Sequence, residues 1–188
     1  MSRISVYLAA PWFTPRQKEI MTKVRNVLLE VENIEIYAPF YDGVVLNKDN
    51  DSPEVRQQVY DANIDSIVGK DLVCAIIDDF DPGTLFEMGF SAGLRWDVEE
   101  QAAMWRDIHQ YLLDRKRPMT IPWTDATNLE YPKIIAYSDV AGRGLNVMLR
   151  QAVWGFANGL GQLREQLIRF KGGEPPANYY IFEKGDVL

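Results

Sequence analysis

The stretch Asp71-Leu-Val-Cys-Ala-Ile-Ile-Asp-Asp79, followed one residue later by Asp81-Pro-Gly-Thr-Leu-Phe-Glu-Met-Gly89, decides the fold of this chain. Its first part is an apolar run bounded by acids, which is typical of a strand buried on both faces of a parallel sheet. Asp81 and Pro82 then supply the N-cap and the first residue of a helix. A helix that begins at the carboxyl end of a buried strand lies where open α/β sheets bind ligands.

Glu87 lies about one and a half turns into this predicted helix. Helical side chains lean toward the N-terminus, so the Glu87 side chain lies over Thr84 and Gly83. Both residues are small, which leaves space beside the carboxylate, and the helix dipole favours its ionised form. Asp-Pro-Gly also opens many ordinary helices. An alternative interpretation is therefore that Gly83 serves only the turn and Glu87 is a solvated helix residue.

Composition narrows the class of protein. The 188 residues are 47% hydrophobic and 25% charged, which fits one globular domain over residues 1–188. The net charge of −7 and the lack of a basic cluster predict no nucleic-acid partner. With one Cys and one His we expect no metal site and no cofactor, and Cys74 should be buried and reduced. No apolar run reaches membrane-spanning length and no signal peptide is evident, so we expect no membrane contact and a cytoplasmic location.

The remaining elements follow from hydrophobic spacing and cap residues. Strands are predicted at residues 4–9, 34–38 and 133–138, and helices at residues 14–31, from residue 52, from residue 81 and, for the most part, at residues 144–170. The polar segment 39–52 is a candidate binding loop because of its length. We also expect a helical insertion at about 97–131 and an apolar tail at about 174–188 that docks on this subunit or a neighbour.

Alternating strands and helices predict a doubly wound α/β fold with a parallel sheet. For about five strands we expect the flavodoxin-like order 2-1-3-4-5, in which strands one and three are neighbours. One pocket would then hold Tyr7, Trp12 and Phe13 against acids that include Asp81 and Glu87. Aromatic walls and acids without a Gly-rich phosphate loop suit a neutral, planar, polyhydroxylated ligand such as a nucleoside.

Five motifs in one order resemble the nucleoside 2-deoxyribosyltransferase family, and they cover the core and both ends of the chain. The motifs are Tyr7-Leu-Ala-Ala-Pro-Trp-Phe-Thr14 with Arg16-Gln17, Asn63-Ile-Asp65, Asp81-Pro-Gly-Thr-Leu-Phe-Glu-Met-Gly-Phe90, Asn146-Val-Met148 and Phe182-Glu-Lys-Gly185. The resemblance implies a homo-oligomer, hexameric or dimer-based, whose active sites are completed across interfaces.

The resemblance also implies catalytic roles. Glu87 would be the nucleophile, Tyr7 would hydrogen-bond it and hold its orientation, and Asp65 would exchange a proton with the base. A continuous helix would carry Asp65 toward the sheet edge opposite Glu87. We therefore predict a break in that helix near residues 61–63.

The substrate-binding roles follow in the same way. The resemblance implies that Asp81 accepts from a sugar hydroxyl and that Asn146 of an adjacent subunit reaches the 5′ end of the sugar. Phe13 and Trp12 would shape the base pocket. From the helix spacing alone, Gly83 is expected to leave an open floor beside the Glu87 carboxylate.

The implied reaction is transfer of 2-deoxyribose between purine or pyrimidine bases of deoxynucleosides, as in nucleotide salvage. It would proceed through a covalent deoxyribosyl–Glu87 intermediate with retention. Two alternatives stay open. The first is an N-glycoside hydrolase of nucleosides or nucleoside 5′-monophosphates on the same scaffold, with Arg143 and Arg150 near Asn146. The second is a non-catalytic nucleotide-sensing module.

Overall fold

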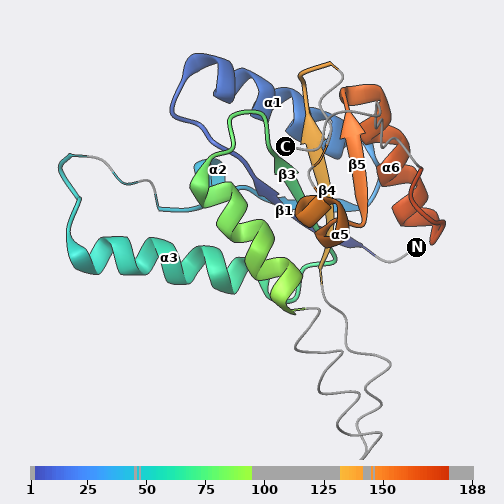
Figure 1. Ribbon diagram of the computed structural model, residues 1–188. Helices are drawn as coiled ribbons and strands as arrows, with labels where there is room; N and C mark the ends of the chain where they lie inside the picture. Colours follow the sequence, from blue (N-terminus) through green and yellow to red (C-terminus); the bar gives the residue numbers. More distant parts are fainter. Residues whose placement is uncertain are drawn as a thin grey trace, which may run out of the picture.

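The computed structural model describes residues 3–44, 46, 48–94, 132–141, 145 and 147–177. The expected insertion at 97–131, the tail beyond residue 177 and Asn146 lie outside these residues. The strands of the sheet are β1 (Ile4–Ala9), β2 (Ile34–Tyr37), β3 (Leu72–Ile76), β4 (Lys133–Ser138) and β5 (Gly155–Asn158). All neighbouring pairs are parallel and the order is β2-β1-β3-β4-β5, so the predicted flavodoxin-like α/β sheet is confirmed (Figure 1).

Helices cover both faces of this sheet. They are α1 (Pro15–Glu30), α2 (Pro39–Asp42), α3 (Pro53–Ile67), a helix over residues 82–94, α5 (Val147–Ala152) and α6 (Leu160–Gly172). Figure 1 shows α1 and α6 on one side of the sheet, and α3, the 82–94 helix and α5 on the other. The connections between successive parallel strands are crossovers that contain helices, as parallel pairing requires, and α6 follows the last strand.

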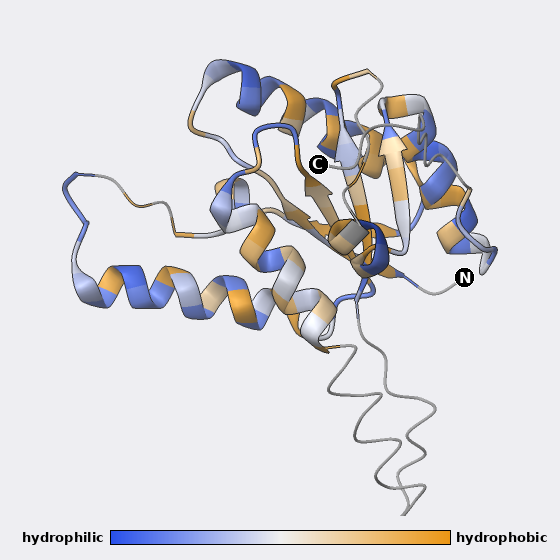
Figure 2. Cartoon of the chain, viewed as in Figure 1, coloured by the Kyte–Doolittle hydropathy of each residue, from blue (hydrophilic) through white to orange (hydrophobic). Residues whose placement is uncertain are grey.

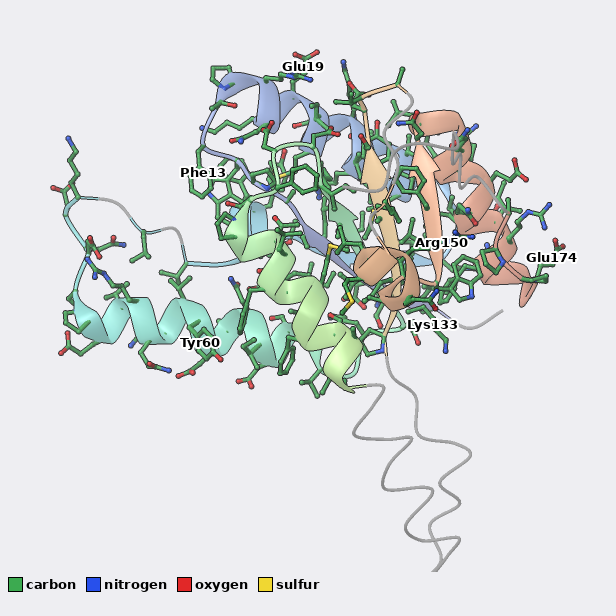
Figure 3. The ribbon with its side chains drawn as sticks, viewed as in Figure 1. Phe13, Glu19, Tyr60, Lys133, Arg150 and Glu174 are labelled. Atoms are coloured by element: carbon green, nitrogen blue, oxygen red, sulfur yellow. The ribbon has the colours of Figure 1, made fainter. Side chains whose placement is uncertain are left out.

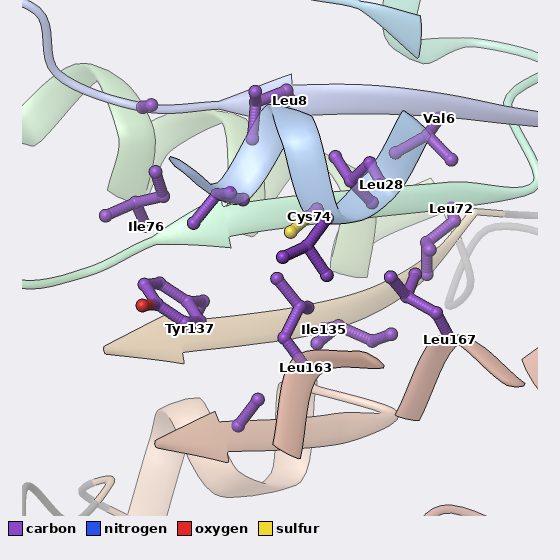
Figure 4. Close-up of a cluster of buried hydrophobic side chains, with 14 of the residues drawn as sticks. Val6, Leu8, Leu28, Leu72, Cys74, Ile76, Ile135, Tyr137, Leu163 and Leu167 are labelled. Atoms are coloured by element: carbon purple, nitrogen blue, oxygen red, sulfur yellow. The ribbon is translucent and has the colours of Figure 1, made fainter. Parts of the chain in front are cut away.

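The first face is a closed apolar core. Alternate residues of the strands, such as Val6, Leu8 and Cys74, meet Leu28 of α1 and Leu163 of α6 (Figure 4). Figure 2 shows the strands coloured as hydrophobic, while α1 carries hydrophilic residues as well. The predicted burial of Cys74 is confirmed, since none of its surface is exposed, and burial raises the pKa of its thiol to about 12. The described side chains at the centre of this face are mainly apolar, and their packing holds the sheet together.

The second face receives the other set of strand side chains. Because successive strand residues point to opposite faces, Tyr7 lies on the side away from Val6 and Leu8. It joins a core cluster that includes Val73, Ile134 and Met88 of the 82–94 helix. The sequence alternation of β1 therefore delivers one tyrosine to the face on which the 82–94 helix packs.

Helix α3 differs from the prediction. It runs without interruption from Pro53 to Ile67, so the expected break near residues 61–63 is wrong. Ile67 is its only buried residue, whereas α1, of similar length, buries five. Figure 1 shows the N-terminal part of α3 reaching away from the sheet. Its capping residue Ser52 accepts from the backbone N–H of Val55, so local signals suffice to begin the helix without a buried partner.

The segment 144–170 also differs, because it contains strand β5 between two helices. Met148, Ala152 and Phe156 follow the spacing of a helix, and this spacing concealed the strand in the sequence. Phe156 nevertheless pairs with Ala136 of β4, so tertiary pairing overrides the local pattern. The predicted loop 39–52 likewise contains the short helix α2, which begins at Pro39.

Candidate active site

Tyr7 and Glu87 form the centre of the candidate site. Tyr7 is fully buried on β1, and its hydroxyl donates to Glu87 Oε1 at 2.6 Å. The Tyr7 ring stacks on Tyr37 of β2, with 5.8 Å between the ring centroids. The two partners are brought together by topology, because β1 lies next to β3 and the 82–94 helix follows β3. One Oε1 atom is thereby held by a fixed donor.

Burial dominates the electrostatics of this pair. It raises the pKa of Glu87 to about 7, the hydrogen bond from Tyr7 opposes this rise, and the Asp81 carboxylate adds to it. The helix N-terminus was expected to favour the ionised carboxylate, and its influence is outweighed because the carboxylate is largely removed from water. Burial and the neighbouring Glu87 also raise the pKa of the Tyr7 hydroxyl, so Tyr7 stays protonated and acts as the donor.

The turn before the helix holds Asp81. The predicted N-cap is confirmed, since Asp81 Oδ2 accepts from the backbone N–H of Thr84 at 2.8 Å and from Thr84 Oγ1 at 3.1 Å. A Cβ atom on Gly83 would lie 3.1 Å from the same oxygen, so a larger residue would crowd the cap. Phe80, just before Asp81, has a φ of 48°, a left-handed conformation that is strained for a bulky residue. A strained backbone persists only where the surrounding contacts hold it, so this turn is held in one conformation.

The loop after β1 carries the two predicted aromatic residues (Figure 3 labels Phe13). Phe13 is 72% exposed, and its ring centroid lies 5.8 Å from that of Trp12. Trp12 also packs on Phe40 of α2 and on the apolar core of the first face, so part of its ring is covered by these contacts. Phe13 is therefore the ring with more surface available to a ligand.

Gln17 fixes this loop, and sequence reasoning gave it no role in the site. It completes a capping box with Thr14: its Oε1 accepts from the backbone N–H groups of Phe13 at 2.8 Å and Thr14 at 2.9 Å. Its Nε2 donates to Asp79 Oδ2 at 2.8 Å. The Thr-Pro-Arg-Gln spacing signals the capping box, but no local signal points to Asp79.

The family model described as nucleoside 2-deoxyribosyltransferase matches residues 6–148, which include all of these side chains. The chain belongs to the nucleoside 2-deoxyribosyltransferase family. It is accordingly a transferase by family, as the sequence motifs predicted. A search of curated protein sequences found no match.

Two solved structures share the fold. One is described as a 2-deoxyribosyltransferase from Bacillus psychrosaccharolyticus; it has a TM-score of 0.56 and 18% identity and covers 85% of this chain and 90% of its own. The other is a conserved protein from Enterococcus faecalis V583, with a TM-score of 0.58 and 13% identity, covering 89% of this chain and 99% of its own. At these identities the likeness shows the fold alone.

The structure does not bring Asp65, to which the family resemblance assigned a proton-exchanging role, to Tyr7 and Glu87. Asp65 is exposed on the last turns of the continuous α3, two residues before the buried Ile67 and so on nearly the opposite side of the helix. Tyr60, on the same side as Ile67, contacts Phe86 with 6.0 Å between ring centroids. The side of α3 that meets the 82–94 helix is thus not the side that carries Asp65. Asn146 lies outside the described residues.

An apolar groove of about 450 Å³ lies between the 82–94 helix and α5, on the side of that helix away from Glu87. Its lining includes Met88, Gly89, Gly93 and Met148, and Glu87 is not part of it. This groove was not predicted from the sequence, although glycines four residues apart on a helix are a signal for a flat, accessible helix surface. The groove and the Glu87 carboxylate therefore lie on different surfaces of the protein.

Within the ranges that the structure describes, no group of His, Cys, Asp and Glu side chains could hold a metal ion. In the same ranges, none of the helices is both long enough and apolar enough to cross a bilayer.

Proposed function

We propose that this protein transfers 2-deoxyribose from one nucleobase of a deoxynucleoside to another, with Glu87 as the nucleophile. The observation that carries the proposal is the 2.6 Å hydrogen bond from buried Tyr7 to Glu87 Oε1, in a chain of this family. A tyrosine that holds one carboxylate oxygen leaves the other oriented for attack.

The reaction takes two steps. The ionised Glu87 carboxylate attacks the anomeric carbon, the C–N glycosidic bond breaks and its electron pair leaves with the base, which takes up a proton. A C–O ester between the sugar and Glu87 has then formed. A second base attacks the same carbon through its nitrogen and gives up the N–H proton, which balances the proton that the first base took up. The C–O ester bond breaks, and its electron pair returns to Glu87 as the carboxylate. Two displacements give net retention at the anomeric carbon, by the logic of retaining glycosidases.

The environment of Glu87 suits this nucleophile. A pKa near 7 makes the carboxylate more basic than an ordinary glutamate while a large fraction stays ionised at neutral pH. The Tyr7 hydroxyl, which stays protonated, stabilises the ionised form through its hydrogen bond. Asp65 stays a prediction as the group that exchanges a proton with the base, and this role requires α3 to rearrange, because Asp65 is exposed on a continuous helix.

Substrate contacts are proposed for the residues around the pair. Asp81 uses Oδ2 for its cap, and in the part of the chain that the structure describes its Oδ1 is left to accept from a sugar hydroxyl. The exposed ring of Phe13, with Trp12 beside it, would stack on the base. Gly83 keeps the floor open below the sugar. Asn146 would bind the 5′ hydroxyl of a substrate in an adjacent subunit.

A homo-oligomer, hexameric or dimer-based, is part of the proposal. The groove beside α5 presents Met148 and Phe80, which are 73% and 49% exposed, so it is an apolar surface suited to a second copy. In the sequence Asn146 immediately precedes α5, which lines this groove, and this adjacency supports the proposal that Asn146 serves an adjacent subunit. Nucleotide salvage is the setting that such base exchange implies.

The test is an exchange assay with deoxyinosine as donor and free adenine as acceptor. We expect deoxyadenosine to form, and intact-protein mass spectrometry without acceptor should reveal a deoxyribosyl adduct on the wild type and not on Glu87→Ala. Free deoxyribose as the main product would favour the hydrolase alternative. Ligand binding without any product would favour the sensing module.

A further inference from the structure

One hydrogen bond connects the two loops on either side of the site. Gln17 Nε2 donates to Asp79 Oδ2 at 2.8 Å, across a separation of 62 positions in the sequence. Gln17 lies in the first turn of α1, and Asp79 lies in the turn between β3 and the 82–94 helix. This contact between side chains therefore joins segments that the backbone does not join.

Each of these segments carries a proposed part of the chemistry. The first holds Phe13, whose backbone N–H donates to Gln17 Oε1 at 2.8 Å. The second leads from Asp79 through Phe80, with its strained φ of 48°, to Asp81 and the helix of Glu87. The strands before them pair at Ala9 and Ala75, so the two segments leave the same sheet edge from adjacent strands.

We propose that the Gln17–Asp79 hydrogen bond is a latch that sets the spacing between the base-stacking loop and the nucleophile turn. Gln17 is then a positioning residue for glycosyl transfer, acting through Phe13 on one side and through Asp79 on the other. The expected effect of the latch on catalysis rests on the proposed function. Its effect on the order of the 77–81 turn does not depend on that function.

The alternative role for Gln17 is only to cap α1. The two roles use different atoms of the Gln17 amide and can be tested separately. Oε1 accepts the capping hydrogen bonds, and Nε2 donates the hydrogen bond of the latch. Gln17→Glu keeps two oxygens to accept from Phe13 and Thr14, but it removes the donor and places a second carboxylate beside Asp79. This substitution therefore breaks the latch and leaves the cap intact.

A second substitution restores the latch with reversed polarity. In the double variant Gln17→Glu/Asp79→Asn, the new amide at position 79 can donate to the new carboxylate at position 17. A matched control is Gln57→Glu on α3, because Gln57 Nε2 donates to Asp61 Oδ1 at the same 2.8 Å. The control makes the same change of charge beside an aspartate, on an exposed part of α3 with no proposed role.

We expect Gln17→Glu to lower kcat/KM for deoxyinosine–adenine exchange about tenfold, since small displacements of reacting groups carry penalties of this order or larger. The loss should fall on both KM for the acceptor base and kcat, with the melting temperature close to that of wild type. The double variant should recover to within about threefold of wild type, and Gln57→Glu should match wild type. A Gln17→Glu variant with wild-type kinetics, or a folded double variant with no recovery, would overturn the latch.

Hydrogen exchange measured by mass spectrometry tests the latch without any reaction. Peptides that cover residues 77–81 should exchange faster in Gln17→Glu than in wild type and return toward wild type in the double variant. A wild-type enzyme that exchanges no bases, yet shows this pattern of hydrogen exchange, would refute the proposed function and keep the latch. Equal hydrogen exchange in wild type and Gln17→Glu would refute the latch alone.

Discussion

Two fully buried tyrosines on opposite faces of the sheet each donate to a carboxylate, and only one of these pairs has the character of a catalytic centre. Tyr7 donates to Glu87 Oε1 at 2.6 Å, and Tyr137 donates to Asp139 Oδ1 at 3.0 Å. Glu87 is partly buried and its pKa is raised to about 7, whereas Asp139 is exposed to solvent. The two pairs differ in the burial of the accepting carboxylate, since both have a buried tyrosine as donor.

The two pairs also differ in how the chain forms them. Asp139 follows Tyr137 by two residues, so their contact is local, whereas 80 positions separate Tyr7 from Glu87. A local pair can follow from the course of one strand into its loop. The distant pair exists only because β1 and β3 are adjacent in the sheet. The comparison shows that the buried pair depends on the tertiary fold, whereas the exposed pair depends only on local chain geometry.

The largest difference between the pairs should appear when the carboxylates are removed. Glu87→Ala should lower the rate of base exchange by about 10⁴-fold or more, because the proposed nucleophile is lost. Asp139→Ala should leave exchange near the wild-type rate, since its carboxylate is exposed and accepts from Tyr137 on the other face of the sheet. Exchange kinetics measure this, and melting temperatures control for folding. Wild-type rates from folded Glu87→Ala would end the assignment of the nucleophile.

Glu87→Gln should stabilise the fold while it stops exchange. The pKa of Glu87 in the folded state lies above its ordinary 4.5, so the folded state binds the proton more tightly and loses stability as pH rises from about 4.5 to about 7. The amide cannot ionise, so at about pH 8 the variant should gain on the order of 1–3 kcal/mol in the free energy of unfolding. The gain should disappear near pH 4.5, and denaturant titrations at both pH values measure it.

The pH dependence of exchange should follow the ionisation of Glu87. In the proposed mechanism only the ionised carboxylate attacks, so kcat/KM should fall about tenfold per pH unit below about 7. The hydrogen bond from Tyr7 lowers the pKa of Glu87, so Tyr7→Phe should move this acidic limb to higher pH and reduce kcat about tenfold. A limb that stays in place in Tyr7→Phe would show that another group controls it.

The smallest effect should come from the second tyrosine. Tyr137→Phe removes a hydrogen bond to an exposed carboxylate, so it should change the free energy of unfolding by about 1 kcal/mol or less. Its kcat and its pH profile should match those of wild type. A shifted acidic limb in Tyr137→Phe would mean that the two faces of the sheet are electrostatically coupled.

Much of the fold could be predicted because local signals and global topology agree. The apolar strands at residues 4–9 and 133–138 and the cap residues Thr14, Ser52 and Asp81 all lie where the structure has them. Strand β5 could not be predicted, because Gly155 weakens a strand pattern and only pairing with β4 determines its conformation.

The site was predictable as a set of residue types and less so as a geometry. The contact of Tyr7 with Glu87 follows from strand order, but the pKa of Glu87 depends on burial that no spacing reveals. The sequence cannot show which side of α3 faces the 82–94 helix, and this decides where Asp65 points. The donor end of Gln17 reaches Asp79 only through the folded sheet, so no motif contains that contact.

Cys74, the single cysteine of the chain, has no exposed surface and a thiol pKa of about 12. It should therefore be inert to alkylating reagents in the native protein. Any cysteine introduced on the surface would then be the one reactive thiol, with no need to remove the native residue first. In a Met148→Cys variant the rate of alkylation would report directly on whether the groove beside α5 is covered in solution, and a spin or fluorescent label there would follow that surface during turnover.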